Sequence, residues 1–229
     1  NGAKIGIQLY HSGRKGRADL ENLVAPSPIA FNEKSPVPKE LTKDEIREIV
    51  KAYQAAAQRA LDIGMDVIEI HAAHGYLINQ FLSPLTNKRI DEYGGTFEKR
   101  LLFLREIIRS VREVWPDSKP LFVRISADEY DDGGLKIEDH VVIARILKNE
   151  GVDLVDCSSG GVLPIRPTNI GPGYQVSYAE KIRRDAEVAS AAVGLIYEPA
   201  LADEIIRNGR ADLIFIGREQ KRNLVIHQN

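Results

Sequence analysis

The stretch that decides the fold reads DVIEIHAAHGYL, residues 66–77. A short apolar run, Asp66–Ile70, is followed at once by two histidines and a tyrosine. Five further runs are also short, rich in Val, Ile and Leu, and mostly apolar on both faces: Lys4–Leu9, Leu121–Ser126, Asp153–Cys157, Ala191–Ile196 and Asp212–Ile216. Strands that are buried on both faces have this composition in parallel sheets. The six runs therefore predict six parallel strands.

Amphipathic segments lie between these runs and predict helices. Thr42 and Glu45 form a capping box in front of a stripe of apolar residues. A second helix is expected to begin near Thr96 and to end before Pro116. Three more are expected over Ile137–Asn149, Ser177–Arg184 and Pro199–Arg207. The alternation of strands with helices indicates βα units around a parallel sheet.

Two architectures contain such units, a doubly wound open sheet and a (β/α)8 barrel. A doubly wound nucleotide-binding domain usually has a glycine-rich turn after its first strand, and the segment Gln8–Arg14 lacks that pattern. Polar residues and glycines instead follow many different strands, as in a barrel: Gln8, His71, Arg124, Ser158, Gly194, Gly217 and Arg218. We predict an α/β, incomplete (β/α)8 TIM barrel, with about six of eight βα units in one domain over residues 1–229. About two units are expected to be missing in front of the first strand, since a barrel typically has about 250 residues.

Composition narrows the function classes. The chain has 229 residues and a formal net charge of −2, so charge gives no general attraction to nucleic acid or membrane. No apolar run is long enough to span a bilayer. The single cysteine, Cys157, fits a reducing compartment and is interpreted as a small buried residue. We expect a cytoplasmic protein whose partner is a small molecule, with no nucleic acid and no membrane. The acidic run Asp128–Asp132 is interpreted as a solvated loop.

His71 and His74 allow three interpretations. A metal site would need a third ligand, and the zinc-protease helix spaces its histidines by four residues, not three. Packing alone is the ordinary explanation for a single histidine. Two imidazole N–H groups that converge on one oxygen would instead bind a carbonyl or phenolate, with Tyr76 as a nearby proton donor. The position at a strand end favours this carbonyl clamp, and no metal is expected.

A charged residue inside an apolar strand also needs an explanation. Arg124 must meet solvent, a buried carboxylate such as Glu69, or an anionic ligand. Gly194 and the pair Gly217 and Arg218 follow the last two strands, where barrels commonly bind phosphate. The sequence therefore leaves an ion pair and an anion site open for Arg124, and favours a phosphate site near Arg218.

The block HAAHGYLINQFLSPLTNKRIDEYGGTFEKR, residues 71–100, resembles the signature of the Old Yellow Enzyme family of FMN-dependent ene-reductases. The blocks GIQLYHSGRK, LFVRISADEY, DLVDCSSGG, AVGLI and NGRADLIFIGRE resemble the other motifs of its bacterial, thermophile-like branch, in order. This resemblance implies FMN at the mouth of the barrel, reduction by NADPH, and an enone substrate whose activated C=C bond is reduced. It also implies homo-oligomers for full-length members.

The resemblance further implies roles for single residues. His71 and His74 would bind the substrate carbonyl oxygen, and Tyr76 would protonate the α-carbon. Cofactor contacts would come from the flavin ring to the phosphate in this order: Gln8, Arg124, Ser159, Gly160, Gly194, Gly217 and Arg218. The family's first two strands are absent from this chain. Two alternatives remain open: the barrel of a larger FMN and iron–sulfur flavoprotein of the dienoyl-CoA reductase type, and a truncated, non-catalytic barrel.

Overall fold

The structure is a computed structural model that describes residues 2–17, 23–165 and 167–219. Six strands form one parallel sheet in the order β1-β4-β5-β6-β7-β8. Their bounds are β1 Gly6–Leu9, β4 Val67–Ala72, β5 Leu121–Ser126, β6 Leu154–Ser158, β7 Ala189–Ala192 and β8 Leu213–Ile214. Within the described residues β1 and β8 each have one neighbouring strand, so the sheet is open. The predicted parallel, incomplete barrel is confirmed.

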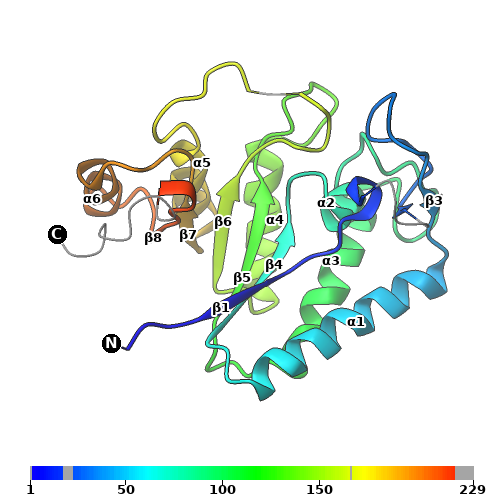
Figure 1. The fold of residues 1–229 in the computed structure, drawn as a ribbon, viewed down its shortest axis with the longest axis horizontal. Helices are drawn as coiled ribbons and strands as arrows, with labels where there is room; N and C mark the ends of the chain where they lie inside the picture. Colours follow the sequence, from blue (N-terminus) through cyan, green and yellow to red (C-terminus); the bar gives the residue numbers. More distant parts are fainter. Residues whose placement is uncertain (1, 18–22, 166, 220–229) are drawn as a thin grey trace.

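Helices connect these strands as βα units. Their bounds are α1 Lys43–Asp62, α2 Leu77–Leu82, α3 Phe97–Arg112, α4 Ile137–Asn149, α5 Val176–Lys181 and α6 Pro199–Arg207. A 3-10 turn covers Gly13–Lys15, a π-helical turn covers Ile182–Ala186, and a small parallel pair joins β2 (Val24–Ala25) to β3 (Lys39–Glu40). Figure 1 shows β4, β5 and β6 side by side at the centre, with α4 behind them and α1 and α3 to one side.

Local sequence explains where the long helices begin. The Thr42 hydroxyl accepts from the Glu45 amide at 3.2 Å, and the Glu45 carboxylate accepts from the Thr42 amide at 2.9 Å. These bonds satisfy amides that would otherwise be unpaired at the start of α1. At the start of α3 the Thr96 hydroxyl accepts from the Lys99 amide. The predicted capping box and the predicted starts of α1 and α3 are therefore confirmed.

The two faces of the sheet differ in character. Ile68, Val123 and Val155 face the helices and are fully buried in the core. On the opposite face, the strand register places Glu69 beside Gln8, His71 beside Arg124, and Arg124 beside Asp156. The expectation of strands that are mostly apolar on both faces is therefore wrong for the face that would line the barrel. Side chains alternate along a strand, so one strand supplies both the core and a polar wall.

Several predicted element boundaries differ from the structure. The strand predicted over Ala191–Ile196 lies at Ala189–Ala192, because the backbone leaves the extended region at Gly194 (φ +119°) and Leu195 (φ +53°). The last strand is shorter than predicted, and the helix predicted to reach Arg184 changes from α5 into the π-helical turn. Helix α2 was not predicted, since all six of its residues are buried and no polar face marks it.

Candidate functional site

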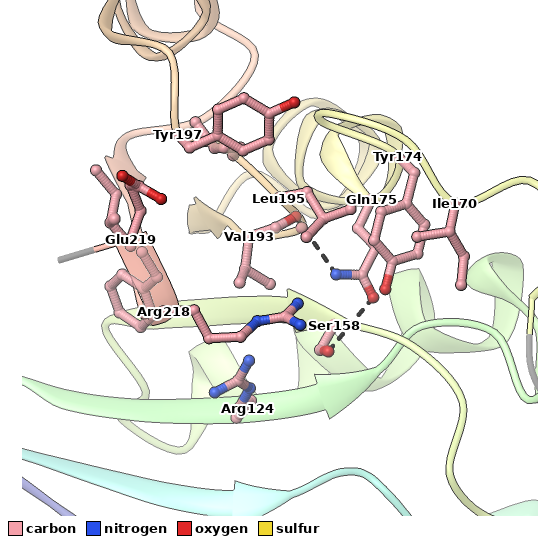
Figure 2. A pocket seen from close by; sticks show the side chains of 15 residues that line it. Arg124, Ser158, Ile170, Tyr174, Gln175, Val193, Leu195, Tyr197, Arg218 and Glu219 are labelled. Carbon is pink, nitrogen blue, oxygen red and sulfur yellow. Dashed lines mark hydrogen bonds between the residues drawn. The ribbon is translucent and has the colours of Figure 1, made fainter. Parts of the chain in front are cut away.

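A cavity of about 570 Å³ lies beyond the carboxyl ends of β5 to β8. Arg124 comes from β5, Ser158 from β6, and Arg218 from the segment after β8. Gln175 and the loop around Gly194 complete the wall. Figure 2 shows the Arg124 and Arg218 guanidinium groups on the same side of the cavity, near Ser158. Two cations that converge on one polar cavity favour an anionic ligand.

Arg124 forms an ion pair with a carboxylate of the barrel face, one of the alternatives that the sequence left open. Its Nε lies 3.0 Å from Oδ2 of Asp156, whose side chain is fully buried. Glu69 instead accepts a hydrogen bond from Nε2 of Gln8 at 2.5 Å. The ion pair that the sequence left open for Arg124 is therefore present, with Asp156 as the carboxylate in place of the suggested Glu69, because the β5–β6 register brings Asp156 directly beside Arg124.

The Arg124–Asp156 pair is electrostatically incomplete. Burial raises the pKa of the Asp156 carboxyl, while the nearby Arg124 charge opposes that rise. The Arg124 Nε and both Asp156 oxygens are buried and make no well-aligned hydrogen bond in the described structure. A buried charge pair without further hydrogen bonds is costly, and an anion in the cavity would supply Arg124 with the acceptors that Asp156 does not.

The two histidines bond to one another. Nε2 of His71 and Nδ1 of His74 are 3.2 Å apart, and Nε2 of His74 is 2.7 Å from the Ser158 hydroxyl. The Ala73 amide donates to Nδ1 of His71 at 3.1 Å. His74 itself has left-handed backbone (φ +57°), and its amide donates to the Ser126 hydroxyl at 2.8 Å. The strand end thus fixes both imidazoles in one hydrogen-bonded group.

Both imidazoles are neutral at pH 7. Burial, supported by the positive charges of Arg124 and Lys15, lowers the pKa of His71 to about 4. Burial, Arg124 and then His71 lower the pKa of His74 to about 3. A neutral imidazole has one N–H donor and one acceptor nitrogen. Each histidine can therefore donate one hydrogen bond to an oxygen, and neither adds a positive charge.

Tyr76 stands next to this pair. It is the N-cap residue of α2, and its ring centroid is 4.9 Å from that of His71, edge to face. The centroid of the Tyr10 ring lies 5.4 Å from that of Tyr76. The structure therefore brings the three predicted catalytic residues together at the end of β4.

Lys15 is a neighbour that sequence reasoning missed. Its Nζ donates to the backbone oxygens of His74 and Gly161 at 2.8 and 3.0 Å, and lies 5.4 Å from the centre of the Tyr76 ring. Lys15 therefore ties the turn after β1 to the histidine loop. The only signal in the sequence was its place in the block GIQLYHSGRK.

The predicted cofactor residues fall into two groups. Four of them line the cavity: Arg124, Gly194, Gly217 and Arg218. The other three lie outside its lining: Gln8 is exposed on β1, Ser159 donates to Oε1 of Gln175, and the Gly160 amide donates to the Asp128 oxygen at 2.7 Å. Cofactor contacts for all seven stay predictions.

One member of the predicted solvated loop is not solvated. Glu129 is 1% exposed and accepts hydrogen bonds from Asn79, Ser83 and the Leu135 amide. Asn79 in turn accepts from the Gly75 amide at 2.7 Å. Glu129 therefore supports α2 and the turn that carries Tyr76, and the solvated interpretation is wrong for this residue.

The described residues contain no group of three or more His, Cys, Asp and Glu side chains that could hold a metal ion. In the same part of the chain, no helix combines the length and apolarity needed to cross a membrane.

Comparison with solved structures supports the fold. The chain is similar to 2-naphthoyl-CoA reductase (TM-score 0.86, 26% identity, covering 93% of this chain and 36% of that one). It is also similar to histamine dehydrogenase from Rhizobium sp. 4-9 (TM-score 0.84, 29% identity, 96% and 33%). An Old Yellow Enzyme homologue from Zymomonas mobilis matches with a TM-score of 0.77 at 28% identity, over 96% of this chain and 64% of that one.

Curated relatives are more similar in sequence. NADPH dehydrogenases from Geobacillus sp. (strain WCH70) and Bacillus subtilis (strain 168) are 57% and 56% identical over 223 residues. These matches cover 97% of this chain and 64% of each relative, so the chain spans about two thirds of their length. The oxidoreductase class, FMN and NADPH expected from the resemblance agree with these relatives and with the family whose model matches residues 1–225. The chain belongs to the NADH:flavin oxidoreductase / NADH oxidase family, as its resemblance to Old Yellow Enzymes implied.

Proposed function

We propose that the protein containing this chain is an FMN-dependent NADPH oxidoreductase that reduces the activated C=C bond of α,β-unsaturated carbonyl compounds. The observation that carries this proposal is the neutral pair His71 and His74 beside Tyr76, next to a cavity with two arginines. Family membership supports the flavin chemistry, and the residues at the end of β4 support the carbonyl substrate.

The residues of the cavity fit an anionic flavin. Arg124 has a buried Nε without an aligned acceptor, and Arg218 faces the same space. No heavy atom lies within 4 Å of the position that a Cβ of Gly217 would take, so a phosphate could approach the backbone there. We assign Arg218, Gly217 and Gly194 to the phosphate and Arg124 to the ring. Gln8, Ser159 and Gly160 are assigned on the resemblance alone.

When bound, FMN would supply the redox chemistry, accepting hydride from NADPH and delivering it to the β-carbon of the enone. The protein's own task is to hold and polarise the substrate. The N–H groups of His71 and His74 would donate to the carbonyl oxygen, which draws electron density from the β-carbon. Tyr76, whose ring packs on His71, would deliver its phenolic proton to the α-carbon.

The test measures FMN binding and cyclohexenone-dependent NADPH oxidation in the full-length protein that contains this chain. Arg124→Met should weaken FMN binding, because it removes a cation from the cavity. His74→Ala should retain FMN and lose about 10² to 10³ in kcat, the usual effect of removing one donor to a developing oxyanion. Glu48→Gln, at an exposed position of α1, is the matched control for both measurements. A flavin-loaded protein that shows no enone-dependent oxidation would refute the proposal.

A second candidate is the barrel of a larger flavoprotein. It is favoured by the higher TM-scores to 2-naphthoyl-CoA reductase and histamine dehydrogenase, 0.86 and 0.84, than to morphinone reductase, 0.78. The much higher identity to the NADPH dehydrogenases, 57%, supports the first candidate. Iron and acid-labile sulfide in the full-length protein, with turnover of an unsaturated CoA thioester, would select the second. A protein that binds no FMN would select the non-catalytic barrel. A cytoplasmic location and a homo-oligomeric state stay predictions.

A further inference from the structure

The hydrogen bonds around the two histidines form a chain that continues past them. The chain begins at the Ala73 amide, passes through His71 and His74, and reaches the Ser158 hydroxyl. Ser158 then lies 3.4 Å from Oε1 of Gln175. From this arrangement we infer that Ser158 is a positioning residue, which accepts the Nε2 proton of His74 and so holds its imidazole in one orientation.

The direction of the chain follows from its first member. A backbone amide can only donate, so Nδ1 of His71 must be the acceptor and its Nε2 must carry the proton. The proton on Nε2 of His71 points at Nδ1 of His74, which must accept it. His74 therefore carries its own proton on Nε2 and donates it to Ser158 at 2.7 Å. The reverse direction would set two N–H groups against each other at 3.1 Å, at Ala73 and His71.

The far end of the chain is consistent with this direction. The Ser158 hydroxyl receives a proton from His74 and so donates its own to Oε1 of Gln175. Gln175 must present its oxygen there, because its Nε2 donates to the Val193 oxygen at 3.4 Å. Figure 2 shows Ser158, Gln175 and Val193 joined in this way at the edge of the cavity. Every link from the Ala73 amide to the Val193 oxygen thus agrees in direction.

The hydrogen-bond chain has a consequence for substrate binding, which rests on the proposed function. Each imidazole N–H is already donated within the chain: His71 donates to His74, and His74 donates to Ser158. A carbonyl oxygen must compete with these acceptors, and the tautomers that it needs are present before it arrives. Ser158 therefore preorganises the pair and also sets the hydrogen bond that a substrate must replace.

The test is nitrogen NMR of the protein labelled with ¹⁵N-histidine, without FMN or enone. The chain has five histidines, so their side-chain signals can be assigned by substitution. At pH 7 both His71 and His74 should be neutral and protonated on Nε2 alone. Ser158→Ala removes the acceptor of the His74 Nε2 proton, so the Nε2 signal of His74 should shift and broaden, while Nδ1 stays unprotonated because His71 still donates to it. His71 should keep its tautomer, because the Ala73 amide still holds it.

Ser159→Ala is the matched control, since Ser159 donates to the same Gln175 oxygen but is not a member of the hydrogen-bond chain that runs through the two histidines. It should leave the His74 signals unchanged. His140 is fully buried on α4, and its unchanged signal would show that each variant is folded. A His74 protonated on Nδ1 in the unsubstituted chain would overturn the inference, whatever the variants do. So would an unchanged His74 in folded Ser158→Ala. Neither result depends on flavin or enone, so the inference can fail while the proposed function stands.

Discussion

Glu129→Gln tests whether the buried carboxyl of Glu129, which contacts α2 beside the site, makes the stability of the fold depend on pH. Glu129 is 1% exposed and accepts hydrogen bonds from Ser83 at 2.7 Å, the Leu135 amide at 3.0 Å and Asn79 at 3.2 Å. Three donors favour the charged form, but burial outweighs them and raises the pKa of Glu129 from 4.5 to about 7. The folded state therefore binds a proton at this site more tightly than the unfolded chain does.

The sign of the pH dependence follows from that difference. A carboxyl whose pKa is raised on folding contributes stability below its unfolded pKa of 4.5, and this contribution is lost as pH rises through about 7. At about 1.4 kcal/mol for each pH unit between the two pKa values, the full effect is about 3 kcal/mol, and about 2.5 kcal/mol of it falls between pH 5 and pH 8. Gln cannot titrate, so the variant lacks this dependence.

The assay is urea unfolding of the two proteins at pH 5 and pH 8. The stability of the unsubstituted chain relative to Glu129→Gln should fall by about 2.5 kcal/mol between these pH values, because only the unsubstituted chain has a proton to lose at this position. Glu48→Gln changes an exposed carboxylate on α1, so its profile should run parallel to that of the unsubstituted chain. If the Glu129→Gln profile were also parallel, the buried carboxyl would not titrate near neutrality and the reasoning would be refuted.

Two further predictions concern the histidine loop. Gly161→Ala places a Cβ 2.7 Å from the His74 Cα at a backbone φ of +89°, and should cost about 1 to 3 kcal/mol in unfolding free energy through strain; Gly171→Ala, where a Cβ meets no heavy atom within 4 Å, should cost much less, and equal losses would contradict the prediction. The pKa of His71 falls from 6.5 to about 4 on folding, so its stabilising effect is present above pH 6.5 and is lost as pH falls toward 4. Between pH 7 and pH 5 the unsubstituted chain should lose about 2 kcal/mol relative to His71→Gln in urea unfolding, and equal pH slopes would count against a buried neutral His71.

The elements that sequence predicted best have strong local signals. Helices α4 and α6 lie within the predicted bounds Ile137–Asn149 and Pro199–Arg207, and strand β5 lies within Leu121–Ser126. A capping residue, an apolar stripe or a run of β-branched residues marks each of them. Helix α2 was missed for the opposite reason: its side chains are buried on every side, so the helical period cannot be seen.

In the candidate site, too, the residues that are close together in sequence could be predicted, and the contacts between distant segments could not. His71, His74 and Tyr76 lie within six residues, so a single motif brings them together. The partner of Arg124 could not be predicted in this manner, because Asp156 is 32 residues further along the chain and the pairing depends on strand register. The buried position of Glu129 was missed because the acidic residues near it in sequence are exposed or half-exposed. Two of its three donors, Asn79 and Ser83, come from α2 and its C-cap, far away in sequence.

The register of the sheet therefore decides which charged groups meet in the site, and the pairing of those groups in turn favours this register. If β6 slipped by one residue against β5, Cys157 would stand beside Arg124, and the Asp156 carboxylate would turn toward the apolar core under α4 and α5. Such a slip exchanges the two faces of a strand, and here it would leave Arg124 unpaired and bury a carboxylate without a cation. Breaking a buried ion pair costs about 3 to 5 kcal/mol, so the same pair that prepares Arg124 for an anion also selects the register. The polar wall of the cavity thus helps to specify the fold that forms it.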